Sequence, residues 1–552
     1  MKKRITTANI ANKGHRFLLS FLAIVLTFSV FTHCVSAKDA SVQEPNWPLK
    51  VLSWDLDKAY PGVRYEYRLG VQGGKYPYFF KLLEAPEGMK IHKTMGVISW
   101  TAGMNPESHQ VRIEISDQNN QKLVHSFVLE VNQDAFRFVA TGGSDQNPGT
   151  EAKPWATVKH AVKTATNNKY VYIKEGSYPV QFDILGNDCG KFLAYPDEKV
   201  NLIGSGEDLN KIGILGSGEY IFQGFDVDVN SGRWFFSVDS EHLVNMIIRK
   251  NKLYNIDDDS LENPAFLFFW DGNQTPINGE VHYQNIVVQE NIFHDLKNPF
   301  DHGASATLYD VQDLIYEDNI AYDIDGSGVL DKDDGFRNTF RNNHFHHNPR
   351  GILLANQQTQ GMTDVHHNLI HDCGEAISVG WQPGFLQDVY IHHNTIIGSS
   401  HFRRVLHNNP DSNNVNIYNN IVGDNLSLPY QFVPIEEGDH YVYPSYVLDP
   451  DDDTVRIDRN LIWVSDPNKI AGYDWGIPTM SIDEWHSALF DLNSILADPK
   501  LVPGYALPPG SPYFGKYGRD NAHVPLPGTE PAPAFYFHFP IVKNGRPQQK
   551  ME

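Results

Sequence analysis

Residues that could move protons or bind anions recur at nearly constant spacing between positions 326 and 407. Four short segments (326–332, 350–356, 375–381 and 401–407) each begin seven residues after an asparagine. Their first residues are Gly326, Arg350, Glu375 and His401, and their last residues are Lys332, Asn356, Trp381 and His407. Amines, carboxylates and imidazoles serve as general bases or acids, guanidinium groups bind carboxylates, and an indole can stack on a flat ligand.

Acidic residues precede and overlap the first of these segments. Asp323, Asp325, Asp331 and Asp334 match positions one, three, nine and twelve of an EF-hand loop. The last ligand is Asp rather than Glu, and the flanking residues show strand-like rather than helical patterning. We therefore expect these carboxylates to form a calcium site in a groove, not an EF-hand, and Ca²⁺ is the candidate cofactor.

A repeat predicts how these residues are positioned. The phrase apolar–x–apolar–x–x–Asn–x–apolar recurs with gaps of 28, 24, 25, 26 and 26 residues from Asn291 to Asn420, and looser copies lie at Asn251 and Asn460. A period of this length with strand-like alternation predicts a solenoid of stacked β coils. We expect the residue three before each asparagine to face the interior. We also expect the asparagine itself to adopt the left-handed turn and to bond to the next asparagine.

In a stack of coils, residues at the same position of successive repeats lie next to one another, because neighbouring strands are about 4.8 Å apart. The first residues of the four segments would then form one column and the last residues another, flanking inward-facing Ile352, Leu354, Ile377 and Val379. Arg403 and Arg404 would belong to the same face. The interpretation is a lined groove; the alternative is ordinary polar decoration of strand ends. The pairs His366-His367 and His392-His393 should also stack, either as a solvated ladder or as a metal site.

The rest of the chain divides by composition and pattern. Residues 1–37 read as a signal peptide with a Val35-Ser36-Ala37 cleavage site, and lipid attachment at Cys34 is the alternative. The further expected units are a β-sandwich at 45–132, a solenoid cap at 136–180, the solenoid at 181–514 and a tail at 515–552. The mature protein would be secreted or periplasmic, with Cys189 and Cys373 as buried free thiols.

The charge of the whole chain limits its partners. A formal net charge of −22 argues against a nucleic-acid partner, which requires a basic face. We find no membrane-spanning segment after the signal peptide, and we expect a monomer.

Three resemblances follow from these motifs. The asparagine-anchored repeat resembles the right-handed parallel β-helix of the pectate-lyase-like superfamily, and the segment 73–100 resembles Ig or cadherin-like modules of bacterial surface enzymes. GVLDK, NTFRNNHF and RGILLAN resemble catalytic coils of polysaccharide lyase family six. That resemblance implies that Lys332 is a base with calcium carboxylates before it. The expected arginine of the next coil is Asn356 here, and one expected carboxylate is Ser327.

We therefore expect an all-β protein that degrades polysaccharides, preferably a lyase acting on an acidic, uronate-containing glycan by β-elimination. Lys332 would be the base, Arg350 would neutralise the substrate carboxylate, and Glu375 or His401 would assist proton transfer. Trp381 would stack on sugar, and the remaining substrate-binding candidates are Asn356, Arg403, Arg404 and His407. The alternatives are a glycoside hydrolase using paired carboxylates such as Asp331, Asp334 and Glu375, and a non-catalytic carbohydrate-binding solenoid.

Overall fold

The computed structural model describes most of the chain from residue 42 to residue 519. Within that range the described residues exclude 55, 167, 187, 207–208, 240–243, 271–282, 333–334, 356–358, 380–384, 400, 407–412, 424–429, 435, 438–439, 442–454, 465–470, 474–480, 488–489 and 509. The predicted signal peptide, the Cys34 alternative and the tail beyond 519 lie outside the described residues.

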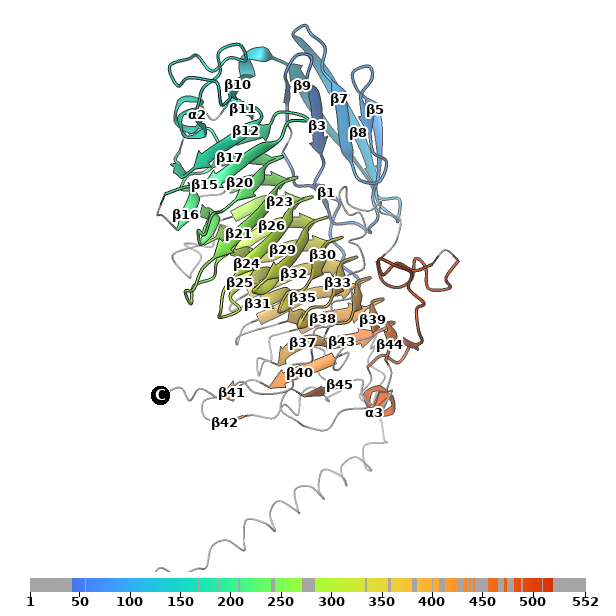
Figure 1. The fold of residues 1–552 in the computed structure, drawn as a ribbon. Helices are drawn as coiled ribbons and strands as arrows, with labels where there is room; N and C mark the ends of the chain where they lie inside the picture. Colours follow the sequence, from blue (N-terminus) through green and yellow to red (C-terminus); the bar gives the residue numbers. More distant parts are fainter. Residues whose placement is uncertain are drawn as a thin grey trace, which may run out of the picture. The chain divides into compact units, whose positions relative to one another are not determined.

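Three long parallel sheets stack into a β-solenoid, and each turn of the chain adds one strand to each sheet (Figure 1). In the described residues the first sheet consists of β10 (Phe136–Val139), β11 (Tyr170–Ile173), β14 (Lys191–Ala194), β17 (Gly218–Gln223), β20 (Val244–Arg249), β23 (Tyr283–Gln289), β26 (Val311–Glu317), β29 (Phe336–Arg341), β32 (Thr359–His366), β35 (Phe385–His392), β38 (Asn413–Tyr418) and β43 (Val455–Asp458).

The second sheet follows the asparagine turn of each coil. Its described strands are β12 (Gly176–Val180), β15 (Val200–Gly204), β18 (Asp226–Asp228), β21 (Lys252–Asp257), β24 (Ile292–Lys297), β27 (Ile320–Ile324), β30 (His344–His346), β33 (Leu369–His371), β36 (Thr395–Ile397), β39 (Ile421–Gly423), β44 (Leu461–Trp463) and β46 (Ile495–Leu496).

The third sheet carries the segments singled out by the sequence. Its described strands are β13 (Phe182–Ile184), β16 (Asn210–Ile214), β19 (Trp234–Val238), β22 (Ala265–Phe269), β25 (Gly303–Tyr309), β28 (Gly326–Lys332), β31 (Arg350–Ala355), β34 (Glu375–Val379), β37 (His401–Leu406), β40 (Tyr430–Pro434) and β45 (Ala471–Tyr473). A short hairpin, β41 (Glu436–Glu437) and β42 (His440–Tyr441), follows β40.

Smaller antiparallel sheets form an N-terminal module. One contains β2 (Lys58–Ala59), β9 (Lys122–Val131), β8 (Glu107–Ser116) and β5 (Phe79–Glu84), with β2 parallel to β9; another contains β3 (Arg64–Arg68), β7 (Val97–Thr101) and β6 (Lys90–Ile91). The third pairs β1 (Lys50–Val51) with β4 (Val71–Gln72). The 3₁₀ turn η1 (Gln133–Ala135) leads into β10. The predicted fold class, a parallel solenoid with a small N-terminal β module, is confirmed.

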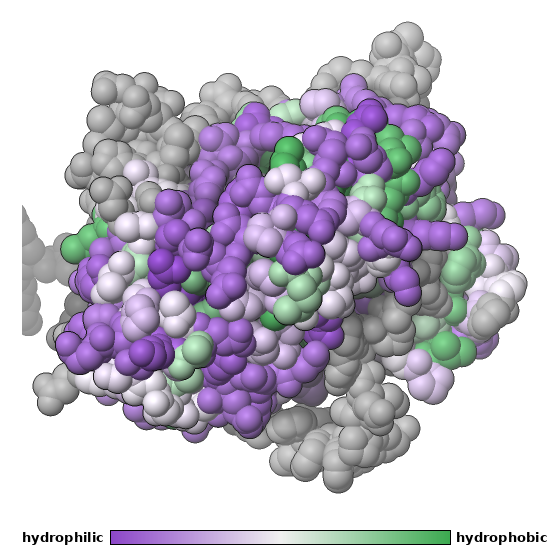
Figure 2. Space-filling model, turned by 90° about the horizontal axis from the view of Figure 1, so that it is seen from above, coloured by the Kyte–Doolittle hydropathy of each residue, from purple (hydrophilic) through white to green (hydrophobic). Residues whose placement is uncertain are grey.

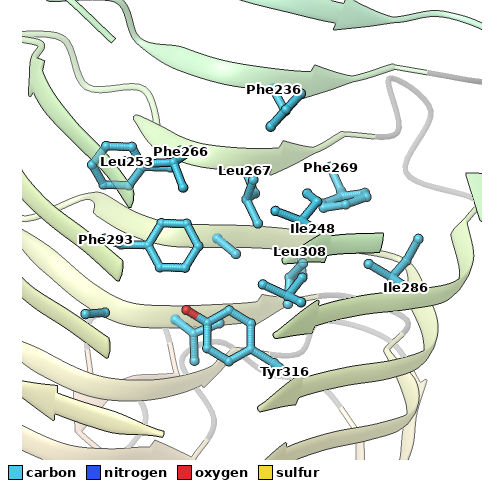
Figure 3. Packing of buried hydrophobic residues seen from close by; sticks show 14 of the residues in the cluster. Phe236, Ile248, Leu253, Phe266, Leu267, Phe269, Ile286, Phe293, Leu308 and Tyr316 are labelled. Carbon is cyan, nitrogen blue, oxygen red and sulfur yellow. The ribbon is translucent and has the colours of Figure 1, made fainter. Parts of the chain in front are cut away.

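The core of the solenoid is the column predicted three residues before each asparagine. These residues are at most 5% exposed: Ile248, Val288, Tyr316, Phe340, Val365, Ile391, Ile417 and Ile457. Figure 3 shows the labelled side chains of neighbouring coils, such as Phe266, Phe293 and Tyr316, pointing into this interior. The helix α2 (Val158–Thr164) buries Val158 and Val162 in the same core, and Thr157 caps its N-terminus.

The asparagine ladder forms as predicted, but its backbone geometry differs. The Asn291 side-chain amide donates to Asn319 Oδ1 at 3.0 Å, and this contact recurs from Asn251 to Asn460. The left-handed residue is the one before each asparagine, for example Asp318 with φ 55°. The prediction that the asparagine itself is left-handed was wrong, because its amide must enter the core to satisfy strand carbonyls such as Ile248 O.

A buried carboxylate ends the ladder. Asn460 donates to Asp491 Oδ1 at 2.9 Å, and the indole of Trp485, in the helix α3 (Ile482–Ser487), donates to Asp491 Oδ2 at 2.8 Å. Burial raises the pKa of Asp491. The last turn therefore supplies a hydrogen-bond acceptor where no further asparagine follows.

The module covers the outer face of the first sheet. Val287 and Ile315 belong to the module's own hydrophobic core, and both are fully buried. Arg68 lies between Glu290 at 2.9 Å and Glu317 at 3.4 Å, and it also contacts Asp318. The module lies against the outer face of the first sheet because that face presents apolar and acidic side chains, which the module buries.

The remaining sequence predictions concern the exterior and the thiols. Cys189 and Cys373 are buried and unpaired, as predicted. None of the helices described here has the length and apolar character needed to span a membrane. The face seen in Figure 2 is mostly hydrophilic, with small scattered apolar patches.

Candidate functional site

The outer face of the third sheet brings Lys332 against Tyr309. The two residues are in register at the ends of β28 and β25. Val329 and Asp331 are fully buried, so strand alternation turns Lys332 outward. Its amine lies 3.3 Å from the Tyr309 hydroxyl and 4.9 Å from the centre of the ring. This places a potential base beside a potential acid on one exposed strand end.

An aromatic cluster extends from Tyr309 along the same face. Phe268 stacks on Trp234 with centroids 4.6 Å apart, and Trp270 meets Tyr309 edge-on at 5.0 Å. Asn263 donates to the Tyr309 hydroxyl at 2.9 Å, and the Trp234 indole donates to the Asn263 carbonyl at 2.8 Å. Phe268 and Tyr309 are only 6% and 5% exposed, so the partly buried rings of Trp234 and Trp270 are the ones that could offer a flat surface to a sugar ring.

Arg350 and Glu375 form a second group on this face. They are paired in register, with Arg350 Nε 3.6 Å from Glu375 Oε2, and both side chains are 16% exposed. Arg350 also donates to the Asp301 carbonyl at 3.2 Å, and the Ser378 hydroxyl donates to Glu375. The carboxylate and guanidinium are thus held by each other and by the neighbouring backbone.

The predicted columns are shifted by one residue at β28. Arg350 pairs with Ser327 rather than Gly326, and Lys332 pairs with Ala355 rather than Asn356. The turn before β28 is one residue longer than the corresponding turn before β31. Gly326 accommodates the extra residue with a backbone φ of 146°. A Cβ there would lie 2.0 Å from the Gly303 carbonyl oxygen, so the position requires glycine.

This register separates Lys332 from Arg350. Lys332 is five residues along β28 from the partner of Arg350, or about 17 Å at strand spacing. The carboxylate and the C5 proton of one uronate cannot reach both side chains. Arg350 therefore does not take the position expected from its phase, next to the proposed base.

Several predicted site residues lie outside the described residues, and for others only the backbone is described. Asn356, Trp381, His407 and Asp334 lie outside the described residues. His401, Arg403 and Arg404 lie in β37, whose backbone alone is described, and His401 is in register with Glu375. The first column is thus Ser327, Arg350, Glu375 and His401.

Three of the four predicted calcium ligands, Asp323, Asp325 and Asp331, have described positions, and Asp334 lies outside the described residues. Asp331 is fully buried and accepts hydrogen bonds from Asn338 at 3.2 Å, on the inward side of β28. Asp325, in the turn before β28, accepts from the Asn298 backbone at 3.0 Å. Burial, with contributions from nearby carboxylates, raises the pKa of Asp323. Among the residues with described positions, no three His, Cys, Asp or Glu side chains converge as metal ligands.

A second site lies between the module and the first sheet. We call it the histidine cleft: a cavity of about 900 Å³ bounded by module loops 44–47, 73–78 and 117–121, by the first sheet and its asparagine turns, and by residues 515–518. Its histidines are His366, His367, His392 and His393. The prediction of a solvated ladder was wrong for these pairs, because the module shields them: His366 is 2% exposed and His392 is 9% exposed.

The four histidines stack as predicted. His366 lies parallel to His392 at 5.0 Å, and His367 lies parallel to His393 at 5.0 Å. Within each coil the two Nδ1 atoms approach to 2.8 Å in the first pair and 2.7 Å in the second. One Nδ1 of each pair must donate and the other accept, so each pair includes at least one neutral imidazole.

The electrostatics of the cleft keep it close to neutral. Burial, followed by the neighbouring histidines, lowers the pKa of His366, His367 and His393 well below the usual histidine value. Asp364 Oδ1 lies 3.0 Å from His392 Nε2, although the two atoms are not aligned for a hydrogen bond. The imidazoles therefore offer both donors and acceptors to a polar ligand.

Sequence reasoning missed the aromatic cluster and misjudged the cleft. Trp234 was predicted as a strand interior, whereas it lies on the outer face. The run of apolar residues at 265–270 contained the missing signal, since alternation that buries Leu267 and Phe269 sends Phe268 and Trp270 outward. The cleft depends on the module loops, more than 200 residues away in sequence, and repeat phase alone does not predict it.

Comparisons with known proteins agree with the fold. A family model described as "Right handed beta helix region" matches residues 210–396. A 77-residue segment, 13% of the chain, is 38% identical to the uncharacterized protein YwoF of Bacillus subtilis (strain 168), and it covers 16% of that protein. The chain therefore matches about a sixth of that relative's length. The solenoid is a parallel β-helix, and residues 210–396 are similar to the right-handed β-helix family.

Solved structures with similar folds include carbohydrate-active proteins. XylC in complex with xylose is 11% identical, with a TM-score of 0.39, over 66% of this chain and 87% of that one. The family 28 exopolygalacturonase of Yersinia enterocolitica is 9% identical, with a TM-score of 0.37, over 79% and 97%. A PL6 family alginate lyase, AlyGC, is 11% identical, with a TM-score of 0.34, over 67% and 57%.

Proposed function

We propose that this protein is an exported polysaccharide lyase whose substrate lies along the outer face of the third sheet. The single observation that carries the proposal is the Lys332 amine, 3.3 Å from the Tyr309 hydroxyl at the edge of the aromatic cluster. A base, an acid and a stacking surface thereby meet at one point of an outward-facing sheet. Export rests on the predicted signal peptide.

The reaction would be a β-elimination on a uronate unit. The neutral amine of Lys332 takes the C5 proton, the C5–H electrons form the C4=C5 double bond, and the C4–O bond breaks. The Tyr309 hydroxyl, oriented by Asn263, returns a proton to the departing oxygen. Calcium has no step here, because the described carboxylates do not form a site for it.

A polymeric substrate gives Arg350 and Glu375 a different role from the expected one. At about 17 Å from Lys332 along the strands, Arg350 would bind the carboxylate of another uronate in the same chain. Glu375 would hold the guanidinium in place through their 3.6 Å contact. The separation between the two groups therefore favours a polysaccharide over a single sugar.

The hydrolase alternative has less support. A glycosidase needs two carboxyl groups flanking the bond that breaks. Of its candidates, Asp331 points into the core, Asp334 lies outside the described residues, and Glu375 is held by Arg350 and Ser378. The outward face around Lys332 instead offers an amine and a phenol, which suit elimination.

The test is a product assay on alginate, pectate, glycosaminoglycans and sulfated algal glycans. A lyase generates an unsaturated uronate that absorbs in the ultraviolet, together with new reducing ends. Reducing ends without that absorbance would establish hydrolysis and overturn the proposal. Retention of a glycan with no product would establish the non-catalytic binding alternative.

A further inference from the structure

The histidine cleft has buried polar atoms that the described chain leaves without aligned hydrogen bonds. They are Trp47 Nε1, Asp364 Oδ1, His392 Nε2 and Arg459 Nε. Trp47 is 5% exposed, and Asp364 and His392 are each 9% exposed. A buried donor or acceptor without a partner costs about 1–3 kcal/mol. Trp47 Nε1 and Arg459 Nε, together with the misaligned Asp364–His392 pair at 3.0 Å, indicate that a polar molecule completes the site.

The charges around the cleft indicate what kind of molecule this is. Its lining holds three carboxylates (Glu44, Asp117 and Asp364) and three cations (Lys75, Arg459 and Lys516). Lys75 pairs with Glu44 at 3.0 Å, and the Asp117 carboxylate accepts from two backbone amides. The three carboxylates and three cations balance, so these lining residues carry no excess charge with which to attract an anionic or cationic ligand.

Aromatic rings form much of the remaining wall. The Tyr76 ring packs against His366 at 5.1 Å and against His367 at 4.8 Å. Tyr418 stacks on His392 at 4.9 Å, and Trp47 lies on the module side. Flat rings combined with neutral donors and acceptors match a ligand with apolar ring faces and hydroxyl edges.

We propose that the histidine cleft binds an uncharged oligosaccharide segment, with a sugar ring against Tyr76 and its hydroxyls on the indole N–H of Trp47 and on the Asp364 and His392 side chains. The site lies on the first sheet, whereas Lys332 lies on the third, so the two sites are independent. The module then supplies one wall of a second sugar site. A transition-metal site is the rival explanation, and the described ligands do not converge on such an ion.

The test is isothermal titration of the full chain with cellohexaose, xylohexaose and mannohexaose, and with a hexauronate as the charged counterpart. At least one neutral hexasaccharide should bind, and Tyr76→Ala should weaken that binding at least tenfold. Tyr322→Ala is the matched control, because Tyr322 also stacks on two histidines, His294 and His346, but on the second sheet. The control should bind as the wild type does.

Other outcomes would overturn the inference. These are binding of none of the neutral probes, tighter binding of the hexauronate, equal losses in both tyrosine variants, or binding of ZnCl₂ that Tyr76→Ala leaves intact while His367→Gln abolishes it. Near-ultraviolet circular dichroism confirms that each variant is folded. Lys332→Ala should leave the titration unchanged, so failure of this inference can be distinguished from failure of the lyase proposal.

Discussion

The outer face of the third sheet and the histidine cleft differ in how they are built. The first is made by successive coils alone, so its residues recur about one coil apart, as Tyr309 and Lys332 do. The second needs the module, whose loops at 73–78 and 117–121 lie far from the histidines in sequence. The comparison shows that one solenoid can build one surface by repetition of its coils and a second by docking of a module.

The largest expected effect separates the two regions by chemistry. Lys332→Ala should lower turnover by about 10²–10⁴-fold, the usual contribution of a general base, while sugar binding in the cleft persists. The measurement is the rate of ultraviolet product formation. Lys252→Ala is the matched control, because Lys252 also lies over a tyrosine ring, at 5.1 Å, but on the second sheet. Unchanged turnover in Lys332→Ala would remove the proposed base.

The next effect separates the regions by structure. Arg68→Leu leaves Glu290, Glu317 and Asp318 without the module's guanidinium, and losing one partner of a buried ion pair costs about 3–5 kcal/mol. We expect faster proteolysis of the module and loss of cleft binding, with turnover retained.

The control for that variant is Arg112→Leu. Arg112 is half-exposed and lies 4.0 Å from Glu84, and a surface pair of this kind contributes about 0–1 kcal/mol. Equal protease resistance of the two variants would contradict the docking role of Arg68.

Acid should act on the cleft before it acts on the third sheet. Burial alone would raise the pKa of Glu290, but the guanidinium groups of Arg249 and Arg68 lower it from 4.5 to about 2. Such a carboxylate stabilises the folded state above pH 4.5, and the stabilisation of about 3 kcal/mol is lost as the pH falls towards 2.

Glu290→Gln sharpens this test. Thermal melts between pH 6 and about 2 should show a shallower pH dependence in the variant than in the wild type, because the titrating carboxylate has gone. Parallel curves would show that Glu290 does not link docking to pH.

The smallest expected effect joins the two regions. Asn343→Ala removes a side chain that bonds to Asn319, Asn368 and the Tyr316 carbonyl, at a cost of about 1–3 kcal/mol. Both product formation and cleft binding should then fail at a lower temperature. The control is Asn201→Ala, because the Asn201 amide donates to the Ser177 hydroxyl at the surface, away from the ladder. A melt unchanged in Asn343→Ala would contradict the role of the ladder.

Repeat phase was sufficient to predict the solenoid and its interior. The inward column from Ile248 to Ile457 and the pairing of Arg350 with Glu375 both follow from a period in the mid-twenties with strand alternation. The phase of the repeat did not predict the strand register where a turn changed length. The extra residue at Gly326 makes Ala355, and not the expected Asn356, the register partner of Lys332. Counting residues from each asparagine cannot detect that shift.

Contacts between distant segments account for the other differences. Nothing local to His366 and His392 indicates that a module 250 or more residues upstream covers them. Likewise, Trp100, considered with Tyr78 as a sugar platform, is 7% exposed and donates to the Glu87 carbonyl. It serves the module's own core, and only Tyr78 of that pair reaches the cleft.

The docked module also bears on how the protein can be produced. A truncated chain starting at β10 would expose Ile221, Ile247, Val287 and Ile315 to water along one flank, beside carboxylates deprived of Arg68. A continuous exposed apolar surface of this kind promotes self-association. The solenoid is therefore expected to precipitate when expressed alone, because the upstream module covers this apolar surface.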